Sequence, residues 1–322
     1  MELVERMLSG EQQALARLIT LVEREAPEVP EIMRLIHPRV GRGFAIGITG
    51  PPGAGKSTLV DRLTALCRKQ GQTVGIIAVD PTSPFSGGAV LGDRIRMQQH
   101  YLDPGVFIRS MATRGSRGGL PLTTKSVIKR MDAFGKYVIL GETVGVGQTE
   151  LDIIEASDTV LVVLVPEAGD TIQTMKAGLT EIADIFAVNK ADRDGAEYLV
   201  TELKTMLLMS NKGSAWQVPV IPTQGINNTG IDELLQQIEK HHRYLEESGQ
   251  LDRRRREQRR GEFFHTIEQR VREQLTRLIE QDGQLASFVQ KVEQGEVDPY
   301  SAASQVLQDK ALLESWLSGA RK

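Results

Sequence analysis

Residues 50–57 read Gly-Pro-Pro-Gly-Ala-Gly-Lys-Ser and directly follow a strand-like apolar run at 44–49. They match the phosphate-loop pattern, in which a glycine-rich turn joins a strand to a helix. Glycines let the backbone turn tightly, so that successive N–H groups line an anion site at the helix N-terminus. The sequence therefore predicts a bound nucleoside triphosphate. The residues expected around its phosphates are Gly50, Gly53, Ala54, Gly55, Lys56, Ser57 and Thr58.

Two side chains of this loop carry specific chemistry. Lys56 is placed to reach the β and γ phosphates as a point charge, and we expect it to be catalytic. The hydroxyl of Ser57 is the expected direct ligand of Mg²⁺. The alternative is a glycine-rich turn without a ligand, but the strand before it and the helix after it favour a phosphate site.

The choice of base is indicated by a later motif. A second buried-type strand at 184–188 ends in Asn189-Lys190-Ala191-Asp192, the N-K-x-D pattern of GTPases. Guanine offers an N1–H and an exocyclic amine side by side, and the carboxylate of Asp192 can accept from both, whereas adenine offers neither there. We therefore expect GTP and GDP as ligands, held by Asn189, Lys190 and Asp192. Taken alone, the four residues would equally suit a polar loop after a strand.

An acidic residue follows another expected strand, at 137–140. Phosphate-loop proteins hold Mg²⁺ with such a residue, from the side opposite the loop hydroxyl. Glu142 occupies this place, and its long side chain suggests contact through a metal-bound water. Gly145 is the flexible residue whose N–H would sense a γ-phosphate.

The sequence resembles the MeaB/ArgK/MMAA family over nearly its whole length. Members are GTPases that act as chaperones of the adenosylcobalamin-dependent methylmalonyl-CoA mutase, an acyl-CoA mutase. The resemblance implies a SIMIBI-type P-loop NTPase fold and low intrinsic GTP turnover that rises when the mutase orders the switch segments. It rests on Gly-Glu-Thr-Val-Gly-Val-Gly-Gln-Thr-Glu at 141–150, Val-Asp-Pro-Thr-Ser-Pro-Phe-Ser-Gly-Gly-Ala-Val-Leu-Gly-Asp-Arg at 79–94, Met-Ala-Thr-Arg-Gly at 111–115, Pro-Glu-Ala-Gly-Asp at 166–170 and Val-Asp-Pro-Tyr-Ser-Ala-Ala at 297–303.

The same resemblance assigns two more acidic residues to the Mg²⁺ site. Asp80 and Asp93 would stand beside Ser57 and Glu142, and the metal and the triphosphate would offset the mutual repulsion of the three carboxylates. The expected catalytic set is thus Lys56, Asp80, Asp93 and Glu142. From the sequence alone, Asp80 would equally suit a turn before a proline, and Asp93 a helix cap.

Three segments are expected to respond to the nucleotide. Residues 86–94 and 145–150 would be switches that the γ-phosphate orders. A third segment, 169–176, would link the nucleotide state to the mutase surface through Asp170, Gln173 and Lys176, although a solvated helical turn explains these residues equally well. Gln148 has no assigned role, and no catalytic base can be named.

The chain departs from the family pattern in the base-binding loop. The usual Ser-Ala dipeptide after the last strand is replaced by Thr223-Gln224. We still expect these two residues to contact the base, through a backbone N–H.

Length and patterning predict three regions. Of the 322 residues, 1–40 suggest a helical cap, and 41–245 alternate strands and helices, which predicts an α/β fold with a mostly parallel sheet covered by helices on both faces. Residues 246–322 are helical, and the family suggests a homodimer through this region. Its basic run at 251–260 is interpreted as a solvated helix face rather than a nucleic-acid site, because the net charge is −3.

Other features bear on location and on competing functions. Because the sequence has no long apolar run, we expect no membrane span. It has one cysteine, Cys67, which we expect to be an inert buried thiol in a cytoplasmic protein.

An ArgK-like transport ATPase or kinase is an alternative function that Asn189 and Asp192 disfavour. A nickel metallochaperone GTPase is another, and it would need a Cys/His cluster. The only histidine pair, His241-His242, is expected on a polar helix face.

Overall fold

The structure is a computed structural model of the chain and describes residues 2–80, 97–112, 120–143, 155–166, 180–210, 215–281 and 283–309. The strands are β1 (Phe44–Thr49), β2 (Val74–Asp80), β3 (Val106–Ala112), β4 (Val138–Glu142), β5 (Thr159–Leu164), β6 (Ile185–Asn189) and β7 (Val220–Thr223). The helices are α1 (Glu2–Leu8), α2 (Gln12–Glu23), α3 (Val29–Ile36), η1 (His37–Arg39), α4 (Lys56–Lys69), η2 (Gln98–His100), α6 (Leu120–Ala133), α9 (Thr180–Ile182), α10 (Ala196–Ser210), α11 (Ile231–Glu247), α12 (Gln250–Gln281), α13 (Gly283–Glu293) and α14 (Pro299–Gln308).

The strands form one sheet in the order β3-β2-β4-β1-β5-β6-β7, and every neighbouring pair is parallel. The predicted α/β fold with a parallel sheet is therefore confirmed. The register places Ile48 of β1 opposite Glu142 of β4, and Ala78 of β2 opposite the same residue. Because parallel strands end at the same edge, the carboxyl ends of β1, β2, β4, β6 and β7 lie along one edge of the sheet.

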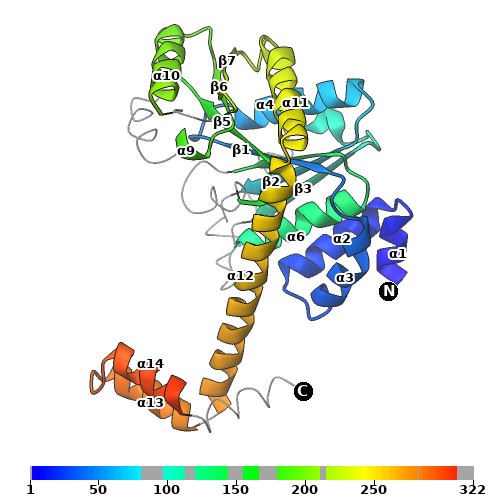
Figure 1. Cartoon of the computed structure of the whole chain (residues 1–322). Helices are drawn as coiled ribbons and strands as arrows, with labels where there is room; N and C mark the ends of the chain where they lie inside the picture. The colour runs from blue at the N-terminus through cyan, green and yellow to red at the C-terminus, as the bar shows by residue number, and fades with distance from the viewer. Residues whose placement is uncertain are drawn as a thin grey trace. The chain divides into compact units, whose positions relative to one another are not determined.

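Helices cover both faces of the sheet (Figure 1). On one face, α4 and α11 pack against alternate residues of the strands, such as Ile46 and Ile48 of β1. On the other face, α6 and the N-terminal helices pack against β2 and its neighbours, and α10 packs against β5, β6 and β7. Since side chains alternate between the faces of a strand, strands covered on both sides are apolar throughout.

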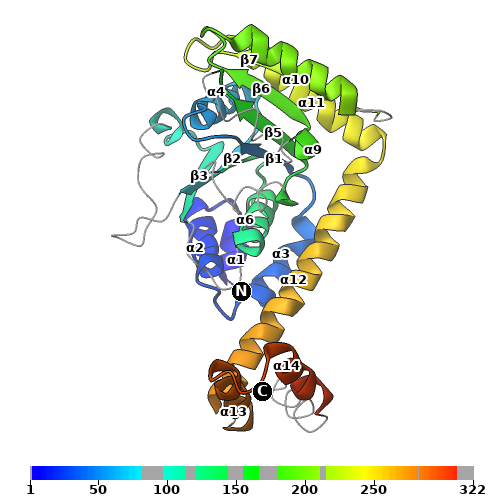
Figure 2. The ribbon, with the colours of Figure 1, turned by 90° about the vertical axis from the view of Figure 1, so that its left-hand side faces the viewer.

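The N-terminal residues fold into α1, α2 and α3 (Figure 2). Helices α2 and α3 pack against α6, and α1 packs against α2 and α3. Leu15, Leu18, Ile19 and Val22 of α2 are all buried, as their helical spacing predicts. Arg109 of β3 donates to the carboxylate of Glu23 and to the hydroxyl of Thr20, and these contacts tie α2 to the sheet.

Cys67 lies on α4 with 1% of its surface exposed. Burial raises the pKa of its thiol to about 12. The expected inert, buried thiol is confirmed, because a thiol with this pKa carries almost no thiolate at neutral pH.

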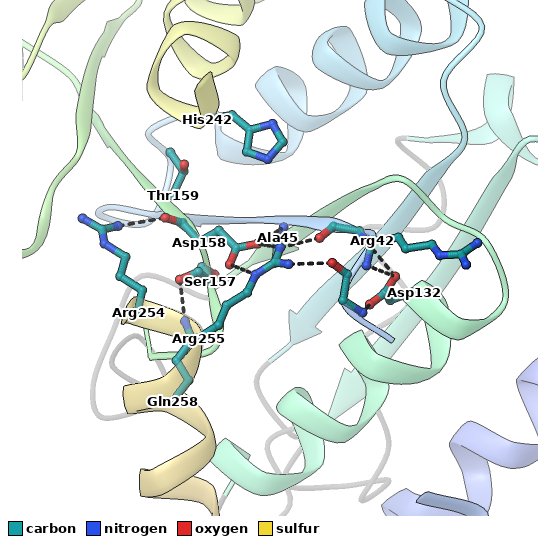
Figure 3. Close-up of polar contacts among 12 residues, drawn as sticks. Arg42, Ala45, Asp132, Ser157, Asp158, Thr159, His242, Arg254, Arg255 and Gln258 are labelled. Carbon is teal, nitrogen blue, oxygen red and sulfur yellow. Dashed lines mark hydrogen bonds and ion pairs between the residues drawn. The ribbon is translucent and has the colours of Figure 1, made fainter. Parts of the chain in front are cut away.

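Three aspartates accept backbone N–H groups near the starts of β1 and β5, and Figure 3 shows two of them, Asp132 of α6 and Asp158. Asp132 accepts from Gly41 and Gly43, and Asp158 accepts from Ala45 of β1. Asp184 accepts in the same way from Val160 of β5 at 2.9 Å. Each carboxylate therefore satisfies backbone donors at or just before the start of a strand.

Two arginines of α12 pair with these carboxylates. Arg255 donates to Asp158 at 2.9 and 2.8 Å, and Arg254 donates to Asp184 at 2.8 and 2.7 Å. Arg255 also donates to the carbonyls of Gly41 and Gly43, both at 2.7 Å. The interpretation of the basic run as a solvated helix face is wrong for these two residues, because their charges are held against the sheet.

The prediction that His241 lies on a polar helix face is wrong, because this residue of α11 is 0% exposed. Its Nδ1 lies 2.8 Å from the hydroxyl of Thr159. Burial lowers the pKa of His241 to about 4. Its neighbour His242 stacks on Phe44, with the ring centroids 3.9 Å apart.

The chain divides into two compact units, Met1–Gln258 and Arg259–Lys322. In the second unit, the side chain of Asp298 caps α14 by accepting from the N–H groups of Tyr300 and Ser301. The part of α12 that belongs to this unit exposes four apolar side chains: Phe263, Phe264, Ile267 and Val271. The predicted boundaries at 40 and 245 stay predictions.

Candidate functional site

The loop between β1 and α4 has the backbone geometry of a phosphate site. Gly50, Gly53 and Gly55 have positive φ angles of 138°, 75° and 87°, a region that side chains disfavour. A Cβ atom on Gly50 would overlap the carbonyl of Val163, and one on Gly55 would overlap the amide of Asn189. Both glycines are therefore required by close approach as well as by their angles.

Lys56 and Ser57 open the helix that follows this loop. Nζ of Lys56 donates to the carbonyls of Gly50 at 2.8 Å and of Pro51 at 3.1 Å, so the ammonium lies inside the curve of the loop. Its side chain is buried, as is that of Ser57. A charge held at the centre of an N–H-lined loop suits a polyanionic ligand.

The hydroxyl of Ser57 and the carboxylate of Glu142, both predicted to hold Mg²⁺, are in direct contact. Oγ of Ser57 donates to Oε1 of Glu142 at 2.6 Å, and both residues are buried. Hard oxygen ligands such as these fit a Mg²⁺ ion. Asp80 ends the adjacent strand β2, so the chain brings its backbone to the same edge of the sheet.

Several predicted residues lie outside the described part of the chain. They are Asp93 of the metal set and the switch and coupling residues Gly145, Gln148, Asp170, Gln173 and Lys176. The structure therefore gives no position for them, and their roles stay predictions.

Asn189 joins the phosphate loop to the predicted base loop. Its Nδ2 donates to the carbonyl of Ala54 at 2.8 Å. Its Oδ1 accepts from the hydroxyl of Thr223 at 3.3 Å and from the N–H of Gly225 at 3.1 Å. One side chain thus fixes two loops, and both are expected to contact the nucleotide.

The two charged residues of this motif follow Asn189 in a turn. Lys190 has a left-handed backbone, with a φ of 57°, and Asp192 is exposed. The N–H of Ala191 donates to the carbonyl of Thr223 at 3.0 Å, which ties the turn to the end of β7. The turn and the base loop therefore lie side by side.

The loop after β7 differs from the expectation in one respect. The N–H of Gln224 donates to the carbonyl of Thr229 at 2.9 Å, and the reverse hydrogen bond is 3.2 Å long. The backbone donor that was expected to face the base is therefore engaged within the loop. Gly225 was not predicted as part of the site, although a glycine next to the base loop can indicate a close backbone approach.

Asp61 of α4, one helical turn beyond Ser57, forms a polar cluster with Gln99 and His100 of η2. Both carboxylate oxygens of Asp61 accept from the side chain of Gln99, and Oδ1 also lies 3.2 Å from Nε2 of His100. Burial alone would raise the pKa of Asp61, but the hydrogen bonds from His100 and Gln99 outweigh it and lower the pKa. The hydrogen bond to Asp61 raises the pKa of His100. This pair fastens α4 to the segment before β3.

Sequence comparison places the chain among known proteins. The family described as "Methylmalonyl Co-A mutase-associated GTPase MeaB" matches residues 15–280. The chain belongs to this family. A protein of Pyrococcus abyssi that is named as a GTPase is 51% identical over 311 residues, which covers 96% of each chain. GTPase ArgK of Escherichia coli is 33% identical and covers 80% of each chain.

Two further relatives agree with the MeaB assignment. The mitochondrial methylmalonic aciduria type A homolog of Mus musculus is 32% identical, over 94% of this chain and 77% of its own. A crystal structure described as a LAO/AO transport system kinase superposes with a TM-score of 0.71 at 26% identity, over 95% of this chain and 96% of that one. This MeaB-family protein is therefore a P-loop GTPase that binds GTP and GDP and hydrolyses GTP.

Across the described residues, none of the protein's helices combines the length and the apolar character that a bilayer crossing requires.

Proposed function

We propose that this GTPase is a nucleotide-dependent chaperone of an adenosylcobalamin-dependent acyl-CoA mutase of the methylmalonyl-CoA type. In this role it gates the loading of the cofactor and protects or reactivates the mutase. The observation that carries the proposal is the match of the mutase-associated family across residues 15–280. The names of the mammalian relative and of ArgK are consistent with it but less specific.

The phosphate chemistry is assigned to the residues at the ends of β1 and β4. Lys56 leaves the loop carbonyls it contacts and neutralises charge on the β and γ phosphates during in-line attack by water. Ser57 and Glu142 hold Mg²⁺, together with Asp80 and Asp93. The metal supplies Lewis-acid neutralisation of the phosphate oxygens.

The base site is assigned to the loops that Asn189 joins. Asp192 accepts from the N1–H and the exocyclic amine of guanine, as two charge-assisted hydrogen bonds. Lys190 lies against the base plane, and Thr223 and Gln224 close the site from the side of β7. These assignments are supported by the hydrogen bonds that bring the two loops together.

The response of the protein to hydrolysis is assigned to three segments. Residues 86–94 and 145–150, which include Gly145 and Gln148, act as switches. Asp170, Gln173 and Lys176 couple the nucleotide state to the mutase. Loss of the γ-phosphate releases the contacts that order such segments, and a partner that prefers one state senses the change.

The remaining assignments concern organisation. We assign residues 1–40 to an N-terminal helical extension, 41–245 to the GTPase domain and 246–322 to a helical region that forms a homodimer. The exposed apolar residues of α12 support this last point. The protein works in the cytoplasm, and neither nucleic acid nor a membrane is its partner. A monomer by light scattering at micromolar concentration would contradict the dimer.

Gel filtration tests the chaperone proposal. The full chain is mixed with the methylmalonyl-CoA-type mutase of the same organism, with either a non-hydrolysable GTP analogue or GDP. We expect a complex whose stability differs between the two nucleotides, and faster GTP turnover in the presence of the mutase. The Lys56→Ala variant is the control, because it should lose the nucleotide dependence. A failure to form a complex in either state, with unchanged turnover, would refute the proposal.

A further inference from the structure

The base loop is a closed turn that needs support from outside. After β7 the chain turns back on itself through the paired backbone hydrogen bonds of Gln224 and Thr229. The side-chain amide of Asn227 donates to Oε1 of Gln224 at 3.0 Å. At the turn, Ile226 is 81% exposed. The side chain of Ile226 therefore contributes little to fixing the turn, whereas Gly225 is buried and polar contacts hold its backbone.

Gly225 is held on its N–H side by Asn189. That hydrogen bond is 3.1 Å long, and Asn189 is itself tied to the phosphate loop through Ala54. A single hydrogen bond fixes a distance but leaves a loop free to pivot. The orientation of the peptide groups beyond Gly225 therefore depends on a second contact.

Arg62 supplies that second contact from helix α4. Its Nε donates to the carbonyl of Gly225 at 3.1 Å, and one terminal nitrogen lies 3.5 Å from the carbonyl of Ile226. The guanidinium presents several N–H donors in a rigid plane, so it can hold two successive carbonyls in one orientation. Because Arg62 and Lys56 lie on the same helix, this contact fixes the position of the base loop relative to the phosphate site.

The backbone of Gly225 also lies close to α4. A Cβ atom on Gly225 would be 3.1 Å from Cγ2 of Thr58 and 3.4 Å from Cδ2 of Leu59. A side chain at this position would crowd Thr58 and Leu59, so that the loop or these two side chains would have to shift by a few tenths of an ångström. Gly225 and Arg62 thus both keep the base loop close to α4, the helix that follows the phosphate loop.

We propose that Arg62 is a positioning residue for base selection, which holds the loop of Thr223, Gln224 and Gly225 at the distance from the phosphate site that guanine requires. The inference rests on the proposed base site. Arg62 acts here through the carbonyls of Gly225 and Ile226 and is assigned no contact with the nucleotide. Its removal should therefore weaken recognition of the base and leave recognition of the phosphates intact.

The test compares dissociation constants for GDP and ADP, measured by calorimetry on the full chain. For Arg62→Ala we expect GDP affinity to fall roughly tenfold, since hydrogen bonds from a charged donor are lost, while ADP affinity stays within about twofold. Arg62→Lys should recover part of the GDP affinity, because an ammonium can still donate to one carbonyl. The matched control is Lys69→Ala, which removes an exposed cation from the end of the same helix.

The outcomes separate the two proposals. If the wild-type protein binds GDP no more tightly than ADP, the guanine site itself is wrong. If the wild type discriminates and Arg62→Ala keeps the wild-type GDP-to-ADP ratio, the positioning role is overturned and the guanine site stands. An equal loss for both nucleotides with a lower melting temperature would also overturn it, because a merely structural residue behaves in this way. Gly225→Ala provides a second variant that should lower the same ratio.

Discussion

The hydroxyl of Ser57 donates a 2.6 Å hydrogen bond to Oε1 of Glu142, and this contact joins the first turn of α4 to the end of β4. The two side chains come from segments 85 residues apart in the sequence. The parallel pairing of β1 with β4 brings them together, because Ile48 lies opposite Glu142. The sheet therefore holds the Ser57 hydroxyl and the Glu142 carboxylate in contact at one edge, where the proposed Mg²⁺ site needs them.

Replacing Glu142 by glutamine tests its role as a metal ligand. Glutamine keeps an oxygen that can accept from Ser57 but removes the negative charge. We expect the Mg²⁺ concentration for half-maximal GTP turnover to rise at least about tenfold. The affinity for GDP in the presence of EDTA should stay within about twofold of wild type. Superimposable Mg²⁺ titrations would show that Glu142 does not serve the metal.

Replacing Asp192 by asparagine tests the base site. The amide presents a donor toward the base in place of one acceptor, so we expect GDP affinity to fall about 100-fold. The affinity for xanthosine diphosphate (XDP), which has a carbonyl in place of the amine of guanine, should rise. Calorimetry with both nucleotides measures the change. Asp194→Asn is the matched control, because Asp194 is exposed in the same turn. Unchanged GDP affinity in the Asp192 variant would remove this residue from the base site.

Replacing Arg255 by alanine tests the ion pair at the strand starts (Figure 3). The side chain of Asp158 is 5% exposed, and the substitution would leave this carboxylate buried without its cation. We expect the free energy of unfolding to fall by about 3 kcal/mol. Urea titration monitored by circular dichroism measures this change. Arg253→Ala is the control, because its pair with Glu257 is exposed and should matter by less than about 0.5 kcal/mol. Equal effects would contradict the buried-pair explanation.

The buried His241 predicts a loss of stability in acid. Burial lowers its pKa in the folded state to about 4, below the ordinary value. Between pH 6.5 and pH 4, His241 is therefore protonated in the unfolded chain but neutral in the folded protein. The stability of the folded protein falls as the pH drops through this range. We expect His241 to account for about 2 kcal/mol of the loss between pH 7.5 and pH 5.

The measurement for His241 is a difference between two proteins. Urea unfolding of wild type and of His241→Asn is compared at both pH values, and asparagine can still bond the hydroxyl of Thr159. The variant should lose less stability in acid than wild type. Identical pH dependence would show that another group is responsible.

Local patterns in the sequence were enough to predict much of the fold. The apolar run at 44–49 predicts a strand, and the structure places β1 at the centre of the sheet. The phosphate-loop pattern gives the start of α4 at Lys56. These features depend on neighbouring residues, so the sequence displays them directly.

Contacts between distant segments could not be predicted in the same way. Arg254 and Asp184 are 70 residues apart, and nothing in the basic run distinguishes a paired arginine from a solvated one. Arg62 and Gly225 are separated by 163 residues and carry no motif. The bond of the Gln224 N–H to Thr229 was missed for another reason, because it depends on the path of a loop without regular structure.

The protected state of Cys67 has a practical consequence for following the switch segments in solution. It is the only cysteine in the chain, and a thiol that is 1% exposed with a pKa of about 12 will scarcely react with maleimide dyes at neutral pH. A cysteine introduced at a surface position of choice would carry nearly all of the fluorophore without further engineering. Nucleotide exchange could then be followed by fluorescence from a single labelled position.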